Sequence, residues 1–128
     1  MNELPPDLAS LLHRSTEEAY VEVFRALSEP LRVRILSMIA SAGDDEYPCT
    51  ALEEKLPISK STISYHIKIL SKAGLISVRK EGRNFRYRLK RPVVDYFVPQ
   101  FLDRIAEEPV GGSEPQGTSP ERSRASSR

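Results

Sequence analysis

The amino-acid sequence predicts a mainly α-helical domain that carries one β-hairpin. Apolar residues recur at helical spacing over much of residues 8–73, whereas the residues after Gly74 alternate between apolar and polar types. A length of 128 residues fits one small domain, and 39% hydrophobic with 29% charged residues is typical of soluble globular proteins. Because tryptophan is absent, we expect an aliphatic core.

The N-terminal half of the chain is expected to be helical. Residues 8–27 have apolar side chains at helical spacing, and the pattern leaves open whether they form one helix or two. Ser28 is expected to cap the next helix, which has Pro30 in its first turn and an apolar stripe that continues to Ile39. This helix is expected to end near Gly43.

Two short helices joined by a tight turn are expected next. Thr50 and Glu53 have the spacing of a capping box for a helix that ends at Leu56. Ser59 is expected to cap the following helix, and Gly74 stands where a helix end needs a left-handed backbone. This pair predicts a helix-turn-helix.

The residues after Gly74 predict a β-hairpin. Its expected turn is residues 81–83, and the apolar side chains of its second arm alternate with basic ones. A helix-turn-helix followed directly by a hairpin with a basic tip predicts a winged helix-turn-helix. In this fold the hairpin lies along the DNA backbone, and Arg83 is expected to reach the minor groove.

Positive charge is concentrated in one part of the chain. The formal net charge is only +1, but residues 55–91 contain eleven basic residues and a single acidic one, Glu81. Such a segment is typical of proteins with a polyanionic partner, although a solvated charged surface is the alternative interpretation. We expect DNA contacts from the helix after Ser59 and from the hairpin, at Lys60, Ser61, Thr62, Ser64, Tyr65, Lys68, Lys72, Arg79, Lys80, Arg83, Asn84 and Arg86.

Two segments resemble the ArsR-type (ArsR/SmtB-like) family of transcriptional regulators. One is FRALSEPLRVRIL (24–36), and the other is SKSTISYHIKILSKAGLISVRKEGRNFRYRL (59–89), which is similar to the recognition helix and wing of that family. The resemblance covers about residues 20–105. It implies a homodimeric winged helix-turn-helix repressor that binds an imperfect inverted repeat and releases DNA when a metal ion or another inducer binds.

The chain departs from that family at both common metal-sensing positions. Residues 46–50 contain one cysteine where many members have a pair, and residues 91–95 contain no histidine where others have ligands. Zinc prefers about four nitrogen or sulfur ligands, and this chain offers His13, His66 and Cys49. We therefore expect no metal and no cofactor. His66 is interpreted as a packing residue, and Cys49 as a buried thiol with a redox switch as the alternative.

The last apolar segment is too apolar for an exposed terminal helix. It runs from Val93 to Ile105, and Pro99 is expected to kink or restart the helix. A domain this small has little core left to cover this segment and the N-terminal apolar residues. We expect a homodimer whose interface contains Leu8, Leu11, Leu12, Tyr20, Phe24, Val94, Phe97, Phe101, Leu102 and Ile105. Whether a small-molecule inducer exists is left open, and its expected site is an apolar gap between the subunits lined by Tyr20, Phe24, Tyr96 and Phe97.

The expected domain organisation has three parts. Residues 1–7 form a leader, residues 8–107 form the DNA-binding and dimerisation domain, and residues 108–128 form a disordered tail rich in Gly, Ser, Pro and Arg. No stretch approaches the roughly 20 apolar residues of a membrane span, and the N-terminus lacks a signal-peptide pattern. A cytoplasmic location is therefore expected.

These patterns favour a sequence-specific DNA-binding transcriptional regulator, most simply a dimeric repressor on an inverted repeat. No enzyme is expected, because the sequence shows no nucleophile with a base, no paired carboxylates and no phosphate-binding glycine loop. The alternative function is a winged helix that docks another protein and does not bind DNA. That alternative predicts weak basicity on the helix and hairpin, contrary to the charge of residues 55–91.

Overall fold

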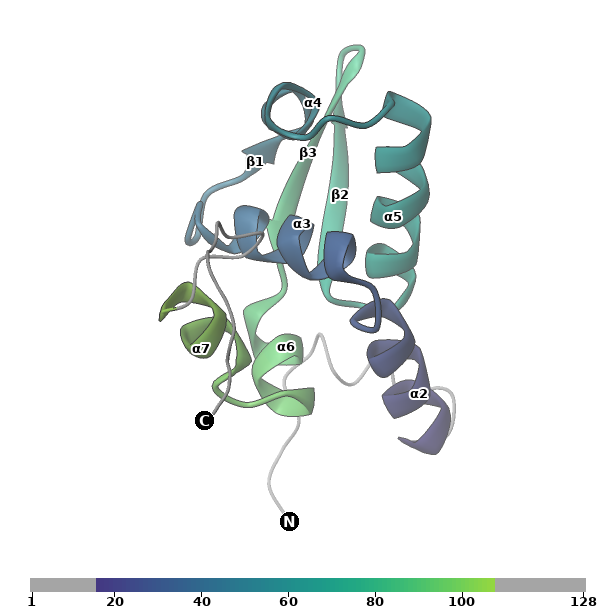
Figure 1. Ribbon diagram of the computed structural model, residues 1–128, viewed down its shortest axis with the longest axis vertical. Helices are drawn as coiled ribbons and strands as arrows, with labels where there is room; N and C mark the ends of the chain where they lie inside the picture. Colours follow the sequence, from purple (N-terminus) through teal and green to yellow (C-terminus); the bar gives the residue numbers. More distant parts are fainter. Residues whose placement is uncertain (1–15, 108–128) are drawn as a thin grey trace, which may run out of the picture.

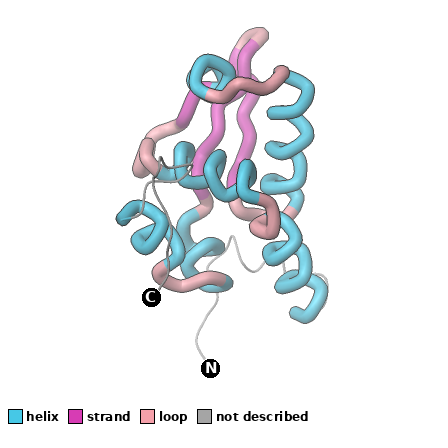
Figure 2. Tube along the Cα trace, in the orientation of Figure 1, coloured by secondary structure: helices cyan, strands magenta, loops and turns pink. Residues whose placement is uncertain are grey.

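The computed structural model describes residues 16–107 and confirms the predicted winged helix-turn-helix (Figure 1). The expected leader, the tail and any helix before Thr16 lie outside the described residues. None of the described helices is long and apolar enough to cross a bilayer. The elements, whose types are coloured in Figure 2, are α2 (Thr16–Ala26), α3 (Pro30–Ala40), β1 (Tyr47–Pro48), α4 (Cys49–Lys55), α5 (Lys60–Lys72), β2 (Ile76–Glu81), β3 (Asn84–Leu89), α6 (Arg91–Phe97) and α7 (Phe101–Glu107).

Three antiparallel strands form the sheet, in the order β1-β3-β2. The predicted hairpin is present, because β2 and β3 pair along their full length. The sequence-based prediction missed β1, in which Tyr47 pairs with Tyr87 and Pro48 pairs with Arg86. Two residues give no detectable alternation, so a strand of this length leaves no periodic signal. Its effect is to cover the edge of β3 beside α4.

The hairpin turn contains Gly82 and Arg83, between the paired residues Glu81 and Asn84. The φ angle of Gly82 is 62°, in the left-handed region that tight two-residue turns require and side chains disfavour. A β carbon at Gly82 would meet no atom within 4 Å. The backbone conformation, rather than lack of space, therefore favours glycine here, and it places Arg83 at the tip of the hairpin.

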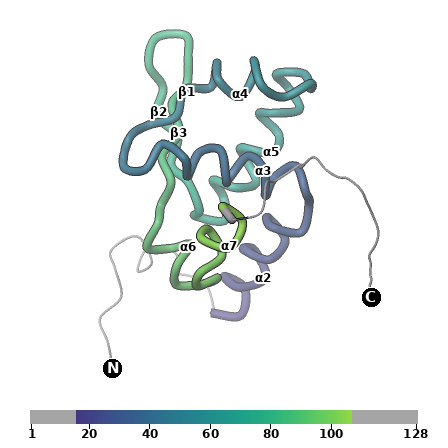
Figure 3. The backbone as a smooth tube through the Cα atoms, turned by 60° about the vertical axis from the view of Figure 1, so that its left-hand side comes forward, coloured from purple at the N-terminus to yellow at the C-terminus, as the bar shows by residue number. Residues whose placement is uncertain are grey.

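The hairpin tip and the terminal helices lie at opposite ends of the domain. Figure 1 and Figure 3 both show the hairpin tip, α4 and the start of α5 at one end, and α2 and α6 at the other. Helix α3 lies between these ends and contacts both β3 and α5. This arrangement separates the predicted DNA-binding elements from the predicted dimer elements.

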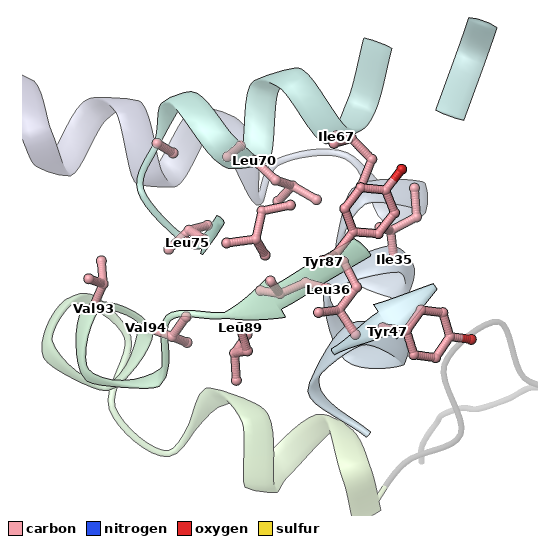
Figure 4. Packing of buried hydrophobic residues seen from close by; sticks show 14 of the residues in the cluster. Ile35, Leu36, Tyr47, Ile67, Leu70, Leu75, Tyr87, Leu89, Val93 and Val94 are labelled. Atoms are coloured by element: carbon pink, nitrogen blue, oxygen red, sulfur yellow. The ribbon is translucent and has the colours of Figure 1, made fainter. Parts of the chain in front are cut away.

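One hydrophobic core joins the helices to the sheet. Figure 4 shows side chains from α3, α5, the hairpin and α6 meeting in a single cluster. Leu36 of α3, Leu70 of α5 and Leu75 before β2 are completely buried. Burying a side chain of this size contributes about 1.5–3 kcal/mol. Because this cluster fixes one side of α5, it also determines which side of α5 faces solvent.

The predicted cap of α3 at Ser28 is wrong, and Glu29 is the N-cap instead. The Glu29 carboxylate accepts a hydrogen bond from the backbone N–H of Arg32 at 3.1 Å. The Ser28 hydroxyl donates to the carbonyl of Arg25 at 2.8 Å and so serves the end of α2. A carboxylate at the start of a helix also interacts favourably with the helix dipole.

The predicted capping box of Thr50 and Glu53 is also wrong. Helix α4 begins at Cys49, with Pro48 as an N-cap that makes no side-chain hydrogen bond. Because β1 ends directly before α4, Thr50 already lies inside the helix and has no capping position to occupy.

Both predicted ends of α5 are confirmed. The Ser59 hydroxyl accepts a hydrogen bond from the backbone N–H of Thr62 at 3.2 Å. At the other end Gly74 has a φ angle of 85°. The N–H of Leu75 donates to the carbonyl of Leu70 at 3.1 Å, as in a Schellman motif. This motif turns the chain directly from α5 into the hairpin.

The predicted interruption at Pro99 is confirmed as a restart. Helix α6 ends at Phe97 and α7 begins at Phe101. Between them Gln100 has a φ angle of 67°, which is uncommon for a residue with a side chain. The two short helices therefore pack as separate elements, and α7 contacts α3.

Arg32 links α2, α3 and α5 by buried hydrogen bonds. Its Nε donates to the carbonyl of Ala26 at 2.8 Å, and its Nη2 donates to the carbonyl of Arg25 at 3.2 Å. Its Nη1 lies 3.1 Å from Nδ1 of His66. A guanidinium can only donate, so His66 must accept through Nδ1 and is therefore neutral. These contacts confirm the interpretation of His66 as a packing residue.

We expect the domain to lose stability as the pH falls below about 6.5. Burial lowers the pKa of His66 from its ordinary value of 6.5; the Arg32 guanidinium acts in the same direction, and the Glu29 carboxylate opposes it. The unfolded chain therefore binds a proton near this pH that the folded chain excludes, so acid favours unfolding. His66→Gln keeps an acceptor for Arg32 without this proton, and its urea midpoint should change less between about pH 7 and about pH 5. Identical pH dependence of the two proteins would contradict the assignment.

Candidate nucleic-acid interface

The exposed face of α5 carries hydroxyl and ammonium groups. Ser61, Ser64 and Lys68 are exposed, and the Tyr65 side chain is 61% exposed. The opposite face contains the buried apolar stripe and His66. Helix α5 contains no carboxylate. The face predicted from the sequence is therefore free of negative charge and can offer donors to phosphates and base edges.

Lys60 and Lys72 lie at the two ends of the same helix, each near a carboxylate. The Nζ of Lys60 is 3.9 Å from Oε1 of Glu53, and the Nζ of Lys72 is 4.0 Å from Oε2 of Glu22. The two lysine side chains are 82% and 74% exposed. Exposed pairs of this kind contribute only about 0–1 kcal/mol, so a phosphate can replace either carboxylate.

The hydroxyls of Ser61 and Thr62 both lie beside the hydroxyl of Ser59 at the start of α5, with oxygen–oxygen distances of 3.1 and 2.9 Å. Ser61 is exposed, whereas Thr62 is half-buried. Ser59 caps α5, so the Thr62 hydroxyl helps to hold the start of the helix. Thr62 therefore lies at the edge of the exposed face of α5 that is predicted to contact DNA.

The hairpin tip and the start of α5 lie around one shared hollow. This hollow has a volume of about 190 Å³, and its lining includes Lys60 and Ser64 of α5 together with Arg83 and Asn84 of the hairpin. Arg83, Asn84 and Lys80 are exposed. The structure therefore brings the predicted helix and hairpin residues together, although they are separated along the chain.

Two predicted hairpin residues are engaged by carboxylates. Nε and Nη2 of Arg79 donate to both oxygens of Glu46, at 2.8 and 2.7 Å. Nε of Arg86 donates to Oε1 of Glu81. The bond from Arg79 holds the pKa of the Glu46 carboxyl below its ordinary value, with smaller effects of the same sign from Arg88 and Arg86. Arg79 and Arg86 are thus less available to phosphates than Arg83.

Sequence reasoning missed two charged residues of this surface. Arg88 is exposed and lies on the same face of β3 as Arg86, as the alternation along this strand already indicated. Glu46 was not predicted at this surface, because the short strand β1 beside it leaves no periodic signal. The face of the sheet that carries Arg86 and Arg88, called the outer face below, is therefore a mixed network of arginines and carboxylates.

Of the candidate metal ligands, Cys49 and His66 are each engaged in another contact, and His13 lies outside the described residues. Within residues 16–107, no group of three or more His, Cys, Asp or Glu side chains is arranged to hold a metal ion. The Cys49 side chain is buried, and its Sγ accepts a hydrogen bond from the backbone N–H of Phe85 at 3.3 Å. Nδ1 of His66 is taken by Arg32. The interpretation of Cys49 as a buried thiol is confirmed.

A cluster of four aromatic rings joins α2 to α6. The ring of Tyr20 lies 4.7 Å from that of Phe97 and 5.8 Å from that of Phe24, measured between centroids. The ring of Tyr96 lies 5.1 Å from that of Phe97. The four residues expected to line an apolar gap therefore pack ring against ring within one protomer. Phe24 and Tyr96 remain 54% and 42% exposed.

The predicted dimer residues divide into three groups. Val94, Phe97 and Leu102 are at most 6% exposed, and the structure places them in the core of the protomer. These three residues pack beneath the exposed residues of the terminal helices and leave little accessible surface area for a second protomer. Leu8, Leu11 and Leu12 lie outside the described residues. The predicted residues that keep accessible area are Tyr20, Phe24, Phe101 and Ile105.

Comparisons with known proteins match this sequence and fold. A family model of a helix-turn-helix domain matches residues 27–79. The HTH-type transcriptional regulator YceK of Bacillus subtilis is 32% identical over 94 residues, which cover 73% of this chain and 93% of the relative. The arsenical resistance operon repressor of Staphylococcus xylosus is 35% identical over 83 residues, covering 65% and 76% of the two chains. A solved structure of an ArsR-like transcriptional regulator from Rhodococcus sp. RHA1 matches with a TM-score of 0.55 and 30% identity, covering 74% of this chain and 86% of that one.

Glu46→Gln is expected to strengthen binding to duplex DNA. The substitution removes the negative charge beside Arg79 and leaves one amide oxygen as an acceptor, so the guanidinium becomes available to a phosphate. We expect a gain of about 0.5–1 kcal/mol at low salt and a steeper dependence on salt concentration. Fluorescence anisotropy with a labelled duplex measures both. Asp44→Asn, in the loop between α3 and β1, is the control with the same change of charge, and equal gains in both variants would contradict the account.

Proposed function

The chain belongs to the ArsR-type family of winged helix-turn-helix transcriptional regulators, and we propose that it is a dimeric repressor that binds an inverted-repeat operator. One observation carries this proposal. The exposed face of α5, from Lys60 to Lys72, presents lysines and hydroxyls without a carboxylate, and the basic hairpin tip lies beside it. A surface of this charge and shape fits the major groove and the adjoining backbone.

The residues of this surface have two different roles in the proposal. Ser61, Ser64, Tyr65 and Lys68 lie along the middle of α5 and read base edges in the major groove. Lys60, Thr62 and Lys72 border this region, and Lys60 and Lys72 contact phosphates. At the hairpin, Lys80, Arg83 and Asn84 contact the backbone or minor groove, whereas Arg79 and Arg86 reach DNA only by exchanging their carboxylate partners.

Variants of the two groups should separate base reading from backbone contact. Replacing Ser61, Tyr65 or Lys68 with Ala is expected to alter sequence preference, at about 1–3 kcal/mol for each lost base contact. Arg83→Ala is expected to weaken all sequences about evenly and to flatten the salt dependence. Binding to a panel of operator variants at several salt concentrations distinguishes these effects. Unchanged sequence preference in all three helix variants would oppose the assigned roles.

Dimerisation is proposed to use the surface of α2 and α6 at the end opposite the hairpin tip. Val21, Phe24 and Tyr96 are each more than 40% exposed there, and Phe101 and Ile105 of α7 are half-buried. Exposed apolar side chains gathered at one end of a small domain are typical of an interface. A twofold axis through this surface would present two copies of α5 to half-sites about 10 bp apart or a multiple of it.

Phe24→Glu is expected to give monomers with much weaker operator binding. The new charge would have no partner in the interface, and the side chain is already 54% exposed in the protomer, so folding should be unaffected. Light scattering measures the oligomeric state, and circular dichroism checks folding. Val78→Glu, a residue of the hairpin that is 40% exposed, is the control and should remain dimeric. A dimeric Phe24→Glu protein would show that the interface lies elsewhere.

We infer that metal ions do not control DNA binding. Cys49 is buried against β3, and Nδ1 of His66 faces a guanidinium that repels cations. Micromolar zinc is therefore expected to leave operator affinity unchanged, and Cys49→Ser is expected to repress normally. Titration of the protein–operator complex with zinc tests this point. Release of DNA at one equivalent of zinc would refute it.

A further inference from the structure

A second groove lies between α5 and the hairpin, and the proposed function leaves its apolar residues without a role. Its volume is about 500 Å³, within the range of small-molecule sites. Its lining includes the apolar residues Ile67, Val78, Phe85 and Tyr87 and the lysines Lys68 and Lys72. Val78 and Phe85 are 40% and 41% exposed, although each is large and apolar. The protomer itself leaves this apolar surface uncovered.

DNA alone does not account for an apolar groove in this place. The groove adjoins the face of α5 that carries Ser64 and Lys68, so bound DNA would lie across it. The surface of a duplex consists of phosphates, sugars and polar base edges, and thymine methyl groups are its main apolar feature in the major groove. A duplex would therefore cover Val78 and Phe85 without offering a comparable apolar body to fill the space between them.

The charged residues around the groove indicate which charge a ligand bound there should carry. Its lining contains no carboxylate. Lys68 lies on one wall, and Lys80 pairs with Phe85 across the hairpin, so it shares the face of the sheet that carries Phe85. Lys72 is 4.0 Å from Glu22, which leaves Lys68 and Lys80 as the stronger attraction for an anion. An apolar floor between lysines matches a molecule with an apolar body and one negative head group.

We propose that this groove binds an amphipathic carboxylate and that this ligand displaces DNA. The apolar body lies on Val78, Phe85 and Ile67, and the carboxylate pairs with Lys68. This regulation rests on the proposed DNA-binding function, because Lys68 and Ser64 belong to both surfaces. Ligand and operator therefore compete for the same residues, and the protein releases DNA without any rearrangement of the fold.

Decanoate, used below its micellar concentration, is the probe for the groove. Isothermal titration calorimetry on the full chain without DNA measures its binding directly. Decylammonium has a similar apolar chain and the opposite charge, and we expect it to bind at least about tenfold more weakly. Fluorescence anisotropy of a labelled duplex then measures the apparent DNA affinity at increasing decanoate, which should fall as expected for simple competition.

Val78→Thr and Phe85→Thr locate the binding site. Both variants place a β-branched threonine in the strand, and the Val78 and Phe85 side chains are partly exposed, so the hairpin should remain folded. Each is expected to weaken decanoate binding about tenfold through lost apolar contact, and to leave DNA affinity without decanoate nearly unchanged. Val21→Thr removes an apolar side chain that is 46% exposed on α2, away from the groove, and it should leave decanoate binding unchanged.

The two binding assays separate this inference from the proposed function. If the chain binds DNA but not decanoate, or if decanoate binds without weakening DNA binding, the inference is overturned. It is also overturned if Val21→Thr weakens decanoate binding as much as Val78→Thr does, or if the groove variants change the oligomeric state, which would assign the groove to a second copy of the chain. Absence of DNA binding without decanoate would instead refute the proposed function, whereas calorimetry would still report on the groove.

Discussion

The fixed position of α5 in the domain is the constraint on which the other features depend. Its apolar stripe is buried against α3 and the hairpin, and Arg32 of α3 reaches the buried ring of His66. The same guanidinium holds the last carbonyls of α2, so three helices share one buried polar contact. Removing one partner of such a contact leaves a buried charge or acceptor without a partner, which is costly. With its inner face held in this way, α5 must turn its lysines and hydroxyls to solvent.

The distribution of charge gives each part of the surface a different role. On α5, Lys60 and Lys72 form only weak ion pairs with neighbouring carboxylates, and a phosphate can replace these carboxylates. On the outer face of the sheet, Glu46 and Glu81 hold Arg79 and Arg86 by close hydrogen bonds. The hairpin is therefore most available at its tip, and the apolar groove between the hairpin and α5 shares Lys68 with the exposed face of α5. A coupling of only about 1–3 kcal/mol between ligand and DNA would suffice for regulation.

The sequence predicted the features that produce a periodic or local signal. The helix-turn-helix, the hairpin, the Ser59 cap and the Gly74 end were predictable because each depends on spacing or on one residue type within a few positions. Strand β1 and the Glu46–Arg79 pair were not, since both depend on contacts across the sheet between residues far apart in the chain. The exposed positions of α5 were predictable from helical geometry. The burial of Phe97 beneath α2 was not, because apolar composition does not distinguish the core of a protomer from an interface.

Selection of bound sequences from a random duplex pool shows whether two copies of α5 read DNA about a twofold axis. We expect enrichment of an inverted repeat whose half-sites are centred about 10 bp apart or a multiple of it. The Phe24→Glu protein should fail to enrich that repeat from the same pool. Enrichment of a single asymmetric site, or of no sequence at all, would contradict the claim.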